Sequence, residues 1–396
     1  MSKVAMSALG NLVDSVETWS PERDAPDDSF VYIDLSAVDQ DAKAITAARE
    51  MPCAEAPSRA RQLVAVGDVL VSTVRPNLNA VAQVPSEFDG ATASTGFCVL
   101  RPRPGTLDGA YLLHWVRSSR FVSEMVRRAT GASYPAVSDR IILESSLPLP
   151  PLPEQRRIAK VLDRAESLRA KRRAALAQLD ALTQSIFLDM FGDPVTNRRG
   201  WAMLCLEDAL AMPLRNGLSP SRSGKIPAKV LTLSAITGSK FDATALKTST
   251  FRSVPPPEQR VDESDFLICR GNGNIRLVGK GYFPTSRMSE VTFPDTIIAA
   301  RVSPELIERG FLQHVWNSKA VRRQIESLAR TTNGTFKVNQ TMLERIAFIA
   351  PPMILQRKFA HRLTAMEKLK ASHRVSVSEL DELFASLQHR AFRGEL

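Results

Sequence analysis

The sequence predicts a mixed α/β (α+β) chain made of two copies of one unit, each a globular domain followed by a long helix. Three observations lead to this fold class. Residues 150–192 have the apolar spacing of one long helix, a related stretch returns 201 positions later, and the segments before the two stretches share one order of predicted strands and helices. A repeat of this length is far too long for a solenoid, so we interpret it as a duplicated unit.

The first long helix is predicted from apolar residues spaced three and four apart. Pro153 lies just inside its start, where a missing N–H costs nothing, and Gly192 lies just past its end. At about 1.5 Å per residue the helix is on the order of 50 Å long, so its apolar seam needs a cover. The seam includes Ile158, Leu168, Leu179 and Leu182.

A second long helix is predicted to be that cover. Shifting the sequence by 201 positions aligns fifteen identical residues in 43 positions, whereas composition alone gives about three. Arg172 and His373 interrupt the two seams at matched positions, and we expect this polar pair to fix the register of the helices. The second seam includes Leu363, Leu369, Leu380 and Leu383.

The repeat divides the chain into four segments. We expect a first globular domain at 1–149, a first spacer helix at 150–192, a second globular domain at 193–350 and a second spacer helix at 351–396. Because the second helix starts at the second domain, it must run antiparallel to the first to cover its seam. The prediction is a pseudo-twofold coiled-coil pair that separates two globular domains.

Alternating and apolar runs predict the strands of the first domain. They occupy 30–35, 63–74 with a Gly67-Asp68 turn, and 96–100. A helical period follows at 110–128, and the Gly- and Pro-containing segment 130–135 is predicted to be a loop. The second domain repeats this order with strands at 230–234, 265–269 and 296–300 and a loop at 332–336.

Composition favours an anionic partner. The net charge of +10 and the pI near 9.7 are typical of nucleic-acid-binding proteins. Four cysteines without metal-ligand spacing predict neither a disulfide framework nor a zinc site, and no apolar run approaches a membrane span. We expect a cytoplasmic protein with reduced thiols.

Motifs for catalysis are absent from the sequence. Gly271-Asn272-Gly273 begins like a dinucleotide fingerprint, but Arg276 replaces the third glycine, and Gly224-Lys225 has the wrong spacing for a phosphate loop. Neither an Asn-Pro-Pro-aromatic tetrapeptide nor a glycine-rich methyl-donor loop is present. We therefore predict no catalytic and no metal-ligating residue.

Two pairs of loops are the candidate binding sites. Arg and Asn follow a predicted strand in each domain, and these side chains can bind guanine and adenine bidentately or contact phosphates. Asn and Gly are also the residues that tight turns need, and that explanation stays open. The predicted DNA-binding residues are Ser72, Thr73, Arg75, Asn77, Asn79, Thr130, Ser133, Tyr134, Arg270, Asn272, Asn274, Arg276, Thr332, Asn333 and Lys337. Arg101 and Arg103 are predicted to be solvated loop charges.

Three stretches together resemble a known family. They are the helix start PPLPEQRRI at 150–158, its degenerate return at 351–357 and the Gly67-Asp68-Val69-Leu70 motif. They are similar to the specificity subunit of type I restriction-modification systems. One departure is Leu355, which stands where the first copy has Glu154.

The resemblance implies a non-catalytic reader of double-stranded DNA. Each domain would recognise one part of a split, asymmetric site, and the chain would organise two adenine-N6 methyltransferase subunits and motor-nuclease subunits. No cofactor is expected on this chain, whereas S-adenosylmethionine, ATP and Mg are expected on those partners. Two other readings stay open: a basic scaffold that binds protein or RNA through its coiled coil, and an enzyme with an unrecognised site.

Overall fold

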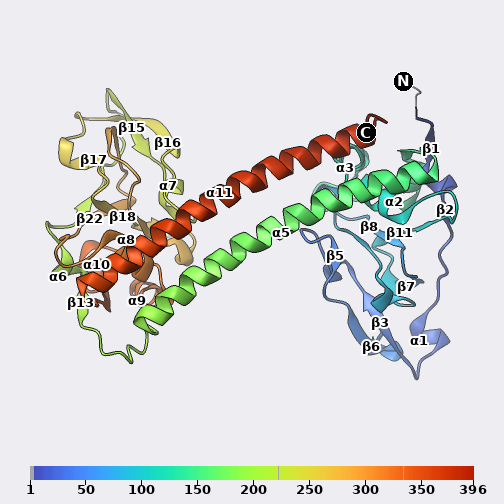
Figure 1. Cartoon of the computed structure of the whole chain (residues 1–396), viewed down its shortest axis with the longest axis horizontal. Helices are drawn as coiled ribbons and strands as arrows, with labels where there is room; N and C mark the ends of the chain where they lie inside the picture. The colour runs from blue at the N-terminus through green and yellow to red at the C-terminus, as the bar shows by residue number, and fades with distance from the viewer. Residues whose placement is uncertain (1–3, 222, 333) are drawn as a thin grey trace. The chain divides into compact units, whose positions relative to one another are not determined.

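The computed structural model describes residues 4–221, 223–332 and 334–396. The chain divides into two compact units: the first is Met1–Ala174 with Arg374–Leu396, and the second is Ala175–His373. Two long helices, α5 (Leu152–Phe191) and α11 (Met353–Ala391), contribute to both units, as the green and red ribbons of Figure 1 show. The mixed α/β class with two globular parts and two long helices is confirmed.

The first unit has two four-stranded sheets, in the orders β6-β3-β10-β7 and β2-β11-β8-β9. Strand β10 runs parallel to β3, and the other ladders are antiparallel. The strands are β2 (Val13–Asp14), β3 (Ser29–Ile33), β6 (Arg49–Pro52), β7 (Ala60–Leu63), β8 (Val69–Ser72), β9 (Val81–Gln83), β10 (Thr92–Ser94) and β11 (Phe97–Pro102). A short pair, β1 (Met6–Ala8) with β12 (Ser146–Pro148), joins the two ends of the domain.

Short helices cover one side of the first unit. The helical period predicted at 110–128 forms two helices, α2 (Gly109–Val116) and then α3 (Ser119–Arg128). Ser118 causes the break: its hydroxyl accepts a hydrogen bond from Phe121 N and caps α3. The helix α4 (Asp139–Glu144) follows the predicted loop at 130–135.

The second unit repeats this topology strand for strand. Its sheets have the orders β16-β15-β21-β17 and β14-β22-β18-β20, with β21 parallel to β15. The strands are β14 (Arg215–Asn216), β15 (Ile226–Leu231), β16 (Leu246–Phe251), β17 (Arg260–Val261), β18 (Asp265–Cys269), β20 (Gly281–Tyr282), β21 (Met288–Thr292) and β22 (Ile297–Arg301). The equivalent helices are α8 (Arg309–Trp316), α9 (Lys319–Leu328) and α10 (Gln340–Glu344), and β13 (Met203–Cys205) pairs with β25 (Ala347–Ile349).

One buried glutamine anchors the start of each long helix. Gln155 accepts from Asp108 N at 2.9 Å and donates to the carbonyls of Thr106 and Pro150. Gln356 accepts from Glu308 N at 2.8 Å and donates to Leu306 O and Pro351 O. This repeated network explains why the Pro-x-x-x-Gln start of the helix occurs twice in the sequence.

The ends of the long helices belong to the domain cores. In the first unit Ile158 and Leu162 of α5 pack in one apolar cluster with Phe384 of α11 and Phe392 just beyond it. In the second unit Phe187 of α5 lies 5.5 Å, between ring centroids, from Phe359 of α11. Early residues of one helix therefore meet late residues of the other in each unit, and the pairing is antiparallel.

An ion cluster joins the two helices within each unit. Arg169 Nε lies 2.7 Å from Asp381 Oδ1, and its Nη1 lies 3.0 Å from Glu166. Lys370 Nζ lies 2.8 Å from Asp180 Oδ1 and 3.1 Å from Glu367. The two clusters are related by the 201-residue shift. Their cations, Arg169 and Lys370, lie three residues before Arg172 and His373, the pair predicted to fix the register of the helices.

Four of the seven predicted seam leucines face solvent. Ile158 is buried, and Leu179, Leu363 and Leu380 are half-buried. In contrast, the exposed fractions are 48% for Leu168, 47% for Leu182, 45% for Leu369 and 50% for Leu383, so their prediction as seam residues is wrong. The seam is narrower than the heptad pattern indicates, because charged residues occupy part of the contact between the helices.

Candidate nucleic-acid interface

Two buried hydroxyls hold the predicted loop that follows β8. The Ser72 hydroxyl donates to Val74 O at 2.9 Å, and the Thr73 hydroxyl donates to Gly96 O at 2.8 Å. Both side chains are buried. Their geometry fits a role in shaping the loop, so the exposed side chains that follow them are the ones that can reach a ligand.

The exposed part of this loop is strained at two residues. Arg75 and Asn79 adopt left-handed backbone conformations with φ of 50° and 47° and flank the short helix Pro76–Leu78, which carries the exposed Asn77. Lys43 donates to Asn79 O, and burial, followed by the nearby Arg117 charge, lowers the pKa of Lys43. Non-glycine residues in this conformation are often found at functional sites.

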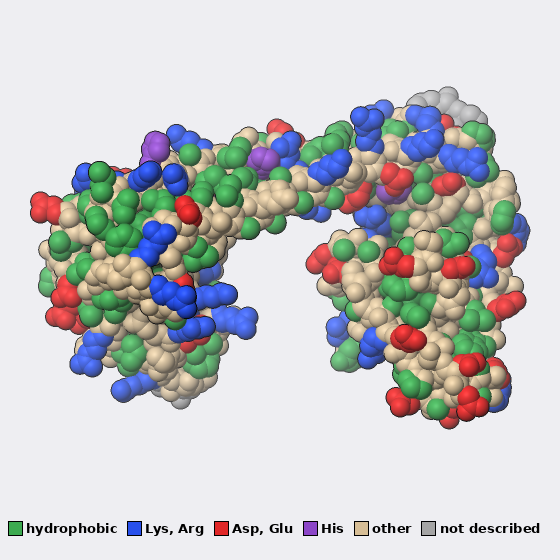
Figure 2. Space-filling model, turned by 60° about the horizontal axis from the view of Figure 1, so that its bottom comes forward, with side chains coloured by type: hydrophobic (Ala, Val, Ile, Leu, Met, Phe, Trp, Pro, Cys, Tyr) green, Lys and Arg blue, Asp and Glu red, His purple; other side chains and the backbone are tan. Residues whose placement is uncertain are grey.

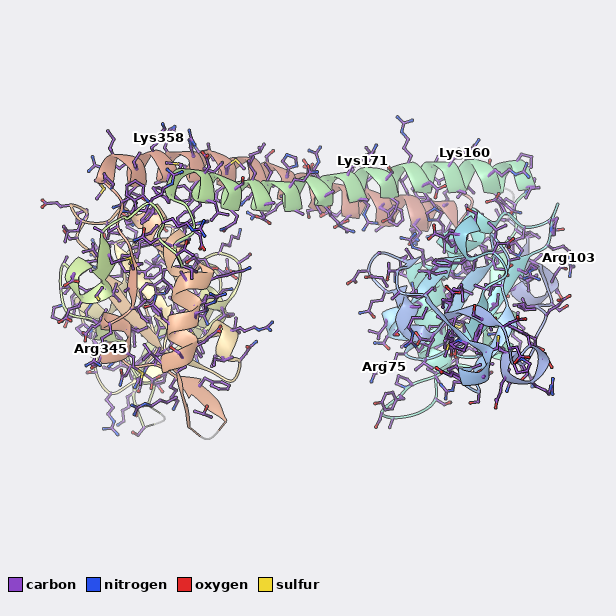
Figure 3. All side chains as sticks on the ribbon, turned by 90° about the horizontal axis from the view of Figure 1, so that it is seen from below. Arg75, Arg103, Lys160, Lys171, Arg345 and Lys358 are labelled. Carbon is purple, nitrogen blue, oxygen red and sulfur yellow. The ribbon has the colours of Figure 1, made fainter. Side chains whose placement is uncertain are left out.

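The second predicted loop of the first unit lies against the first. Ala136 forms isolated antiparallel β-bridges with both Val74 and Thr130. Arg75 N donates to Pro135 O at 2.7 Å. The Arg75 guanidinium lies 4.7 Å from the centre of the Tyr134 ring, and this ring is 68% exposed. Figure 3 shows Arg75 at the end of the unit remote from α5. Thr130 and Ser133 are also exposed, so five of the predicted side chains share one surface: Arg75, Asn77, Thr130, Ser133 and Tyr134.

The same pair of loops meets in the second unit as a small sheet. Its order is β19-β24-β23, with β19 (Gly271–Asn272), β24 (Thr335–Lys337) and β23 (Arg330–Thr332). Gly271 pairs with Lys337, whose side chain is exposed. Thr332 ends β23, and Asn333 lies outside the described residues. The predicted 270–276 and 332–337 loops therefore lie side by side.

The asparagines of the 270–276 loop shape its turns. Asn272 Oδ1 accepts from Asn274 N at 2.9 Å, and Asn274 Oδ1 accepts from Arg276 N at 3.0 Å. Arg270 is half-buried and donates to Asp295 O, whereas Arg276 is exposed. The turn explanation left open by the sequence thus applies to both amide oxygens, while Arg276 and Lys337 project from the surface.

An ion pair at the opposite end of β8 and β18 was missed from the sequence. Arg101, predicted to be a solvated loop charge, binds the buried Asp68 through two hydrogen bonds of 2.8 and 2.9 Å, so that prediction is wrong. Arg301 binds the buried Asp265 through one hydrogen bond of 2.9 Å. The matched Asp and Arg in the two halves were the available signal. Arg103 forms a half-exposed pair with Asp14.

The two globular parts have opposite charge. Residues 1–149 contain 14 Lys and Arg against 18 Asp and Glu, whereas 193–350 contain 22 against 14. Figure 2 shows Lys and Arg gathered on the drawn face of the second unit and many Asp and Glu on that of the first. The basic surface suited to nucleic acid is therefore concentrated in the second unit.

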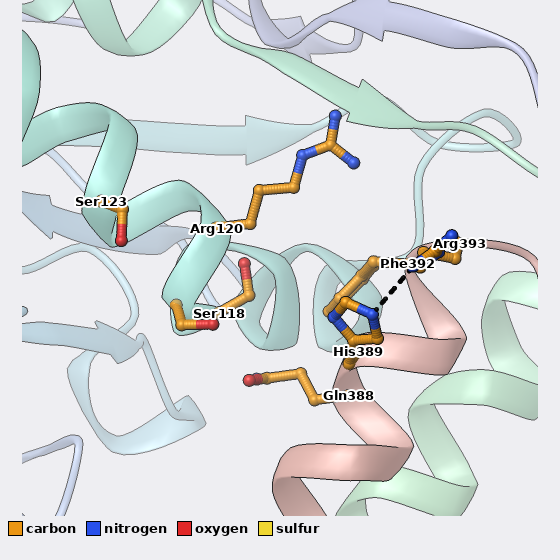
Figure 4. Close-up of a pocket in the computed structure, with 8 residues that line it drawn as sticks. Ser118, Arg120, Ser123, Gln388, His389, Phe392 and Arg393 are labelled. Carbon is orange, nitrogen blue, oxygen red and sulfur yellow. Dashed lines mark hydrogen bonds between the residues drawn. The ribbon is translucent and has the colours of Figure 1, made fainter.

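A hollow of about 430 Å³ in the first unit has no predicted DNA-binding residue in its lining, part of which Figure 4 labels. It is lined by the start of α3 and by the end of α11 with the residues that follow it, and Arg393 contacts His389 at 3.2 Å. The 201-residue shift places Gln388, which lines this hollow, at the position of Phe187. Phe187 is fully buried in the second unit, so the two halves differ here in packing.

Two equivalent histidines have different surroundings. His114 is buried and its Nε2 lies 2.8 Å from Asp163 Oδ1. His314 packs on the Phe187 and Phe359 rings, and burial, followed by the Lys370 charge, lowers the pKa of His314 to about 4. Both are packed helix residues. Across the described ranges no group of three or more His, Cys, Asp or Glu side chains could hold a metal ion, and no helix there is long and apolar enough to span a membrane.

Comparison with known proteins finds one family repeatedly. Residues 67–178 match the family model described as the type I restriction modification DNA specificity domain. The EcoKI type I restriction enzyme specificity subunit of Escherichia coli (strain K12) is 22% identical over 319 residues, which cover 76% of this chain and 68% of that protein.

Solved structures extend the similarity over the whole chain. A chain from work on complex assembly and conformational transition of the type I R-M system is 25% identical, with a TM-score of 0.63 and coverage of 99% of this chain and 98% of its own. The type I restriction-modification S subunit from M. genitalium is 14% identical, with a TM-score of 0.55 and coverage of 98% and 96%, and shows the shared fold.

Proposed function

The chain belongs to the specificity subunits of type I restriction-modification systems and recognises DNA sequence, and on this premise we propose that each unit reads one part of a split, asymmetric site. One observation supports the proposal above the others: in both units the two predicted loops come together into one surface. Because the loops differ in sequence between the units, the two surfaces are suited to different half-sites.

The chain acts in this proposal without catalysis of its own. It brings two adenine-N6 methyltransferase subunits and the motor-nuclease subunits to the DNA in the cytoplasm. S-adenosylmethionine, ATP and Mg bind to those partners and supply the methyl group and the energy for the motor. The loop residues of this chain bind and orient the duplex.

The exposed leucines of the long helices support a scaffolding role. Leu168 and Leu383 lie in the first unit, and their equivalents Leu369 and Leu182 lie in the second. Large apolar side chains exposed at matched positions suit two copies of one partner. We assign these four leucines to the docking of the two methyltransferase subunits.

Mapping of methylated adenines tests the proposed function. The chain is co-expressed with its methyltransferase partner, and the modified sequences are compared for wild type, Arg75→Ala and Arg276→Ala. A lost base contact costs about 1–3 kcal/mol of binding free energy. We expect Arg75→Ala to relax one half-site and Arg276→Ala to relax the other.

Arg140→Ala is the matched control, because Arg140 is an exposed arginine of the first unit that pairs with Glu144 outside the loops. This variant should leave both half-sites unchanged. The loop assignment fails if neither loop variant alters the modified sequence or the affinity. Equal binding of duplexes with and without the mapped site would instead favour the basic scaffold, which the comparisons do not favour.

A further inference from the structure

One ribbon of the second unit carries cations that the loops do not explain. Strands β15 and β16 pair over their whole length, from Leu231 with Leu246 at one end to Ile226 with Phe251 at the other. Side chains directly opposite each other in an antiparallel pair lie on the same face. The register therefore shows which residues of the ribbon share a surface.

One face of this ribbon changes from apolar to basic along its length. Leu231 and Leu246 start the face in the core of the unit. Two residues further along, Lys229 pairs with Thr248, and Pro227 then pairs with Thr250. Lys225 and Arg252 follow one step beyond the last pair. We call Lys225, Lys229, Thr248, Thr250 and Arg252 the ribbon face; all five side chains are exposed.

The charges on the ribbon face are uncompensated. Within the described part of the chain, no carboxylate forms an ion pair with Lys225, Lys229 or Arg252. Lys225 and Arg252 each lie one residue beyond the Ile226–Phe251 pair that ends the ladder, so two cations flank the end of the ribbon. A surface with charge of one sign attracts ions of the opposite sign, so the ribbon face is suited to an anion.

The ribbon face is connected to the predicted 270–276 loop. The Thr250 hydroxyl donates to Ser221 O at 2.7 Å, and Ser221 N donates to Thr250 O at 2.8 Å. Two residues before Ser221, the Ser219 hydroxyl donates to Asp295 Oδ2 at 2.8 Å, and Asp295 O accepts from Arg270. The end of the ribbon and the loop are therefore neighbours in one unit.

The equivalent ribbon of the first unit has the opposite charge. Strands β3 and β6 occupy the places of β15 and β16 in the matching sheet. Residues 21–55 around them contain nine Asp and Glu against three Lys and Arg, whereas 219–253 contain one Asp against six Lys and Arg. The repeated fold does not require this difference in charge. We therefore attribute the difference to the ligand surface that each unit binds.

We propose that the ribbon face of the second unit binds the phosphate backbone of the DNA duplex, beside the bases that the 270–276 loop contacts. The inference rests on the proposed function and adds a surface to it. Lysine and arginine attract the phosphates, and the Thr248 hydroxyl can donate to a phosphate oxygen. The acidic counterpart in the first unit makes no such contact, so the second unit supplies most of the sequence-independent affinity.

The salt dependence of binding by the full chain tests this surface. The variant is Lys225→Gln, Lys229→Gln and Arg252→Gln combined, and the probes are two duplexes of about 40 base pairs, one with the mapped site and one shuffled. Each lost phosphate contact lowers the slope of log K against log salt by about 0.9. We expect the triple variant to lose roughly two to three units of slope on both duplexes and to keep its methylated sequence.

Lys247→Gln is the matched control. Lys247 lies on the same ribbon with the same charge, but it pairs with Val230 on the other face. It should keep the wild-type slope, and unchanged thermal unfolding should show that all variants are folded. A wild-type slope in the triple variant overturns the inference, and so does a change in the methylated sequence. Because the shuffled duplex reports phosphate contacts alone, a failure of site recognition would count against the proposed function and not against the ribbon.

Discussion

The two units bury the same aspartate but pair it differently. In the first unit Asp68 forms its ion pair with Arg101, which binds it through two hydrogen bonds. In the second unit Asp265 contacts Arg301 and also Arg215, which comes from β14, the counterpart of β2. The duplicated fold therefore keeps its buried aspartate, while the neighbouring strand determines how that charge is balanced.

The equivalent histidines of the two units also differ in their surroundings. His114 meets Asp163 on α5, whereas the equivalent place on α11 holds Thr364, whose hydroxyl donates to Ala360 O in its own helix. His314 therefore packs on phenylalanine rings without that carboxylate. Equivalent side chains in one fold can thus have a polar environment in one half and an apolar environment in the other.

Removing the buried aspartate should distinguish the two halves most strongly. Asp265→Asn leaves two arginines without their carboxylate, and Arg215 is only 12% exposed. We expect a loss of about 4 kcal/mol in the free energy of unfolding of the second unit. Asp68→Asn should cost less, about 2–3 kcal/mol, because it leaves one arginine that is better exposed. Urea unfolding followed by tryptophan fluorescence measures both losses, and equal losses would contradict the role given to Arg215.

Acid should weaken the second unit through His314. The pKa of His314 is about 4 in the folded chain, below its ordinary value of 6.5, so the unfolded state binds the proton more readily between these values. The stability that this neutral ring contributes is present above pH 6.5 and is lost as the pH falls toward 4, up to about 3 kcal/mol. His314→Leu should remove this part of the pH dependence in unfolding experiments.

The stability difference between His314→Leu and wild type at pH 8 serves as the control, because it reports the packing change alone. The ion cluster of Lys370, Asp180 and Glu367 is present in both proteins, so its titration cancels in the comparison. If the variant loses as much stability as wild type between pH 6.5 and 4, the assignment to His314 is wrong.

The helix-start glutamines should give the smallest difference. Gln155 makes its three hydrogen bonds at 3.0 Å or less, whereas one bond of Gln356 is stretched to 3.5 Å. We expect Gln155→Ala to cost about 2 kcal/mol and Gln356→Ala about 1 kcal/mol in unfolding free energy. Gln178→Ala, an exposed change in α5, should stay within about 0.5 kcal/mol of wild type. A larger cost for Gln356→Ala would reverse the order of the two networks.

The repeat made much of this fold predictable from sequence. The Pro-rich start at 150–158 and its return at 351–357 located both long helices, and short apolar runs located β8, β18, β11 and β22. The break at Ser118 was missed because the apolar spacing continues across α2 and α3, and only the cap hydrogen bond ends the first helix. The seam leucines were overestimated because a heptad pattern does not show whether a charged side chain such as Arg169 or Lys370 occupies the contact.

The sequence predicted which loops form the candidate site, but not which contacts their side chains make. Strand ends followed by Arg and Asn indicated segments 72–79 and 270–276, and the structure brings each beside its partner loop. Which side chains turn inward, such as Ser72 and Thr73, depends on tertiary hydrogen bonds that no local pattern contains. The ribbon face was missed because Arg252 and the two threonines are distant in sequence from Lys225 and Lys229 and are brought near them only by strand pairing.

The first unit is built from two separate segments of the chain, and this affects the order in which the units can fold. Its core contains Phe384, Ala391 and Phe392 from the last part of the printed sequence, whereas the second unit is the continuous segment 175–373. During synthesis on the ribosome the second unit can therefore finish folding while the first still lacks part of its core. A stop codon shortly before Phe384 would leave the second unit whole and the first one without part of its core.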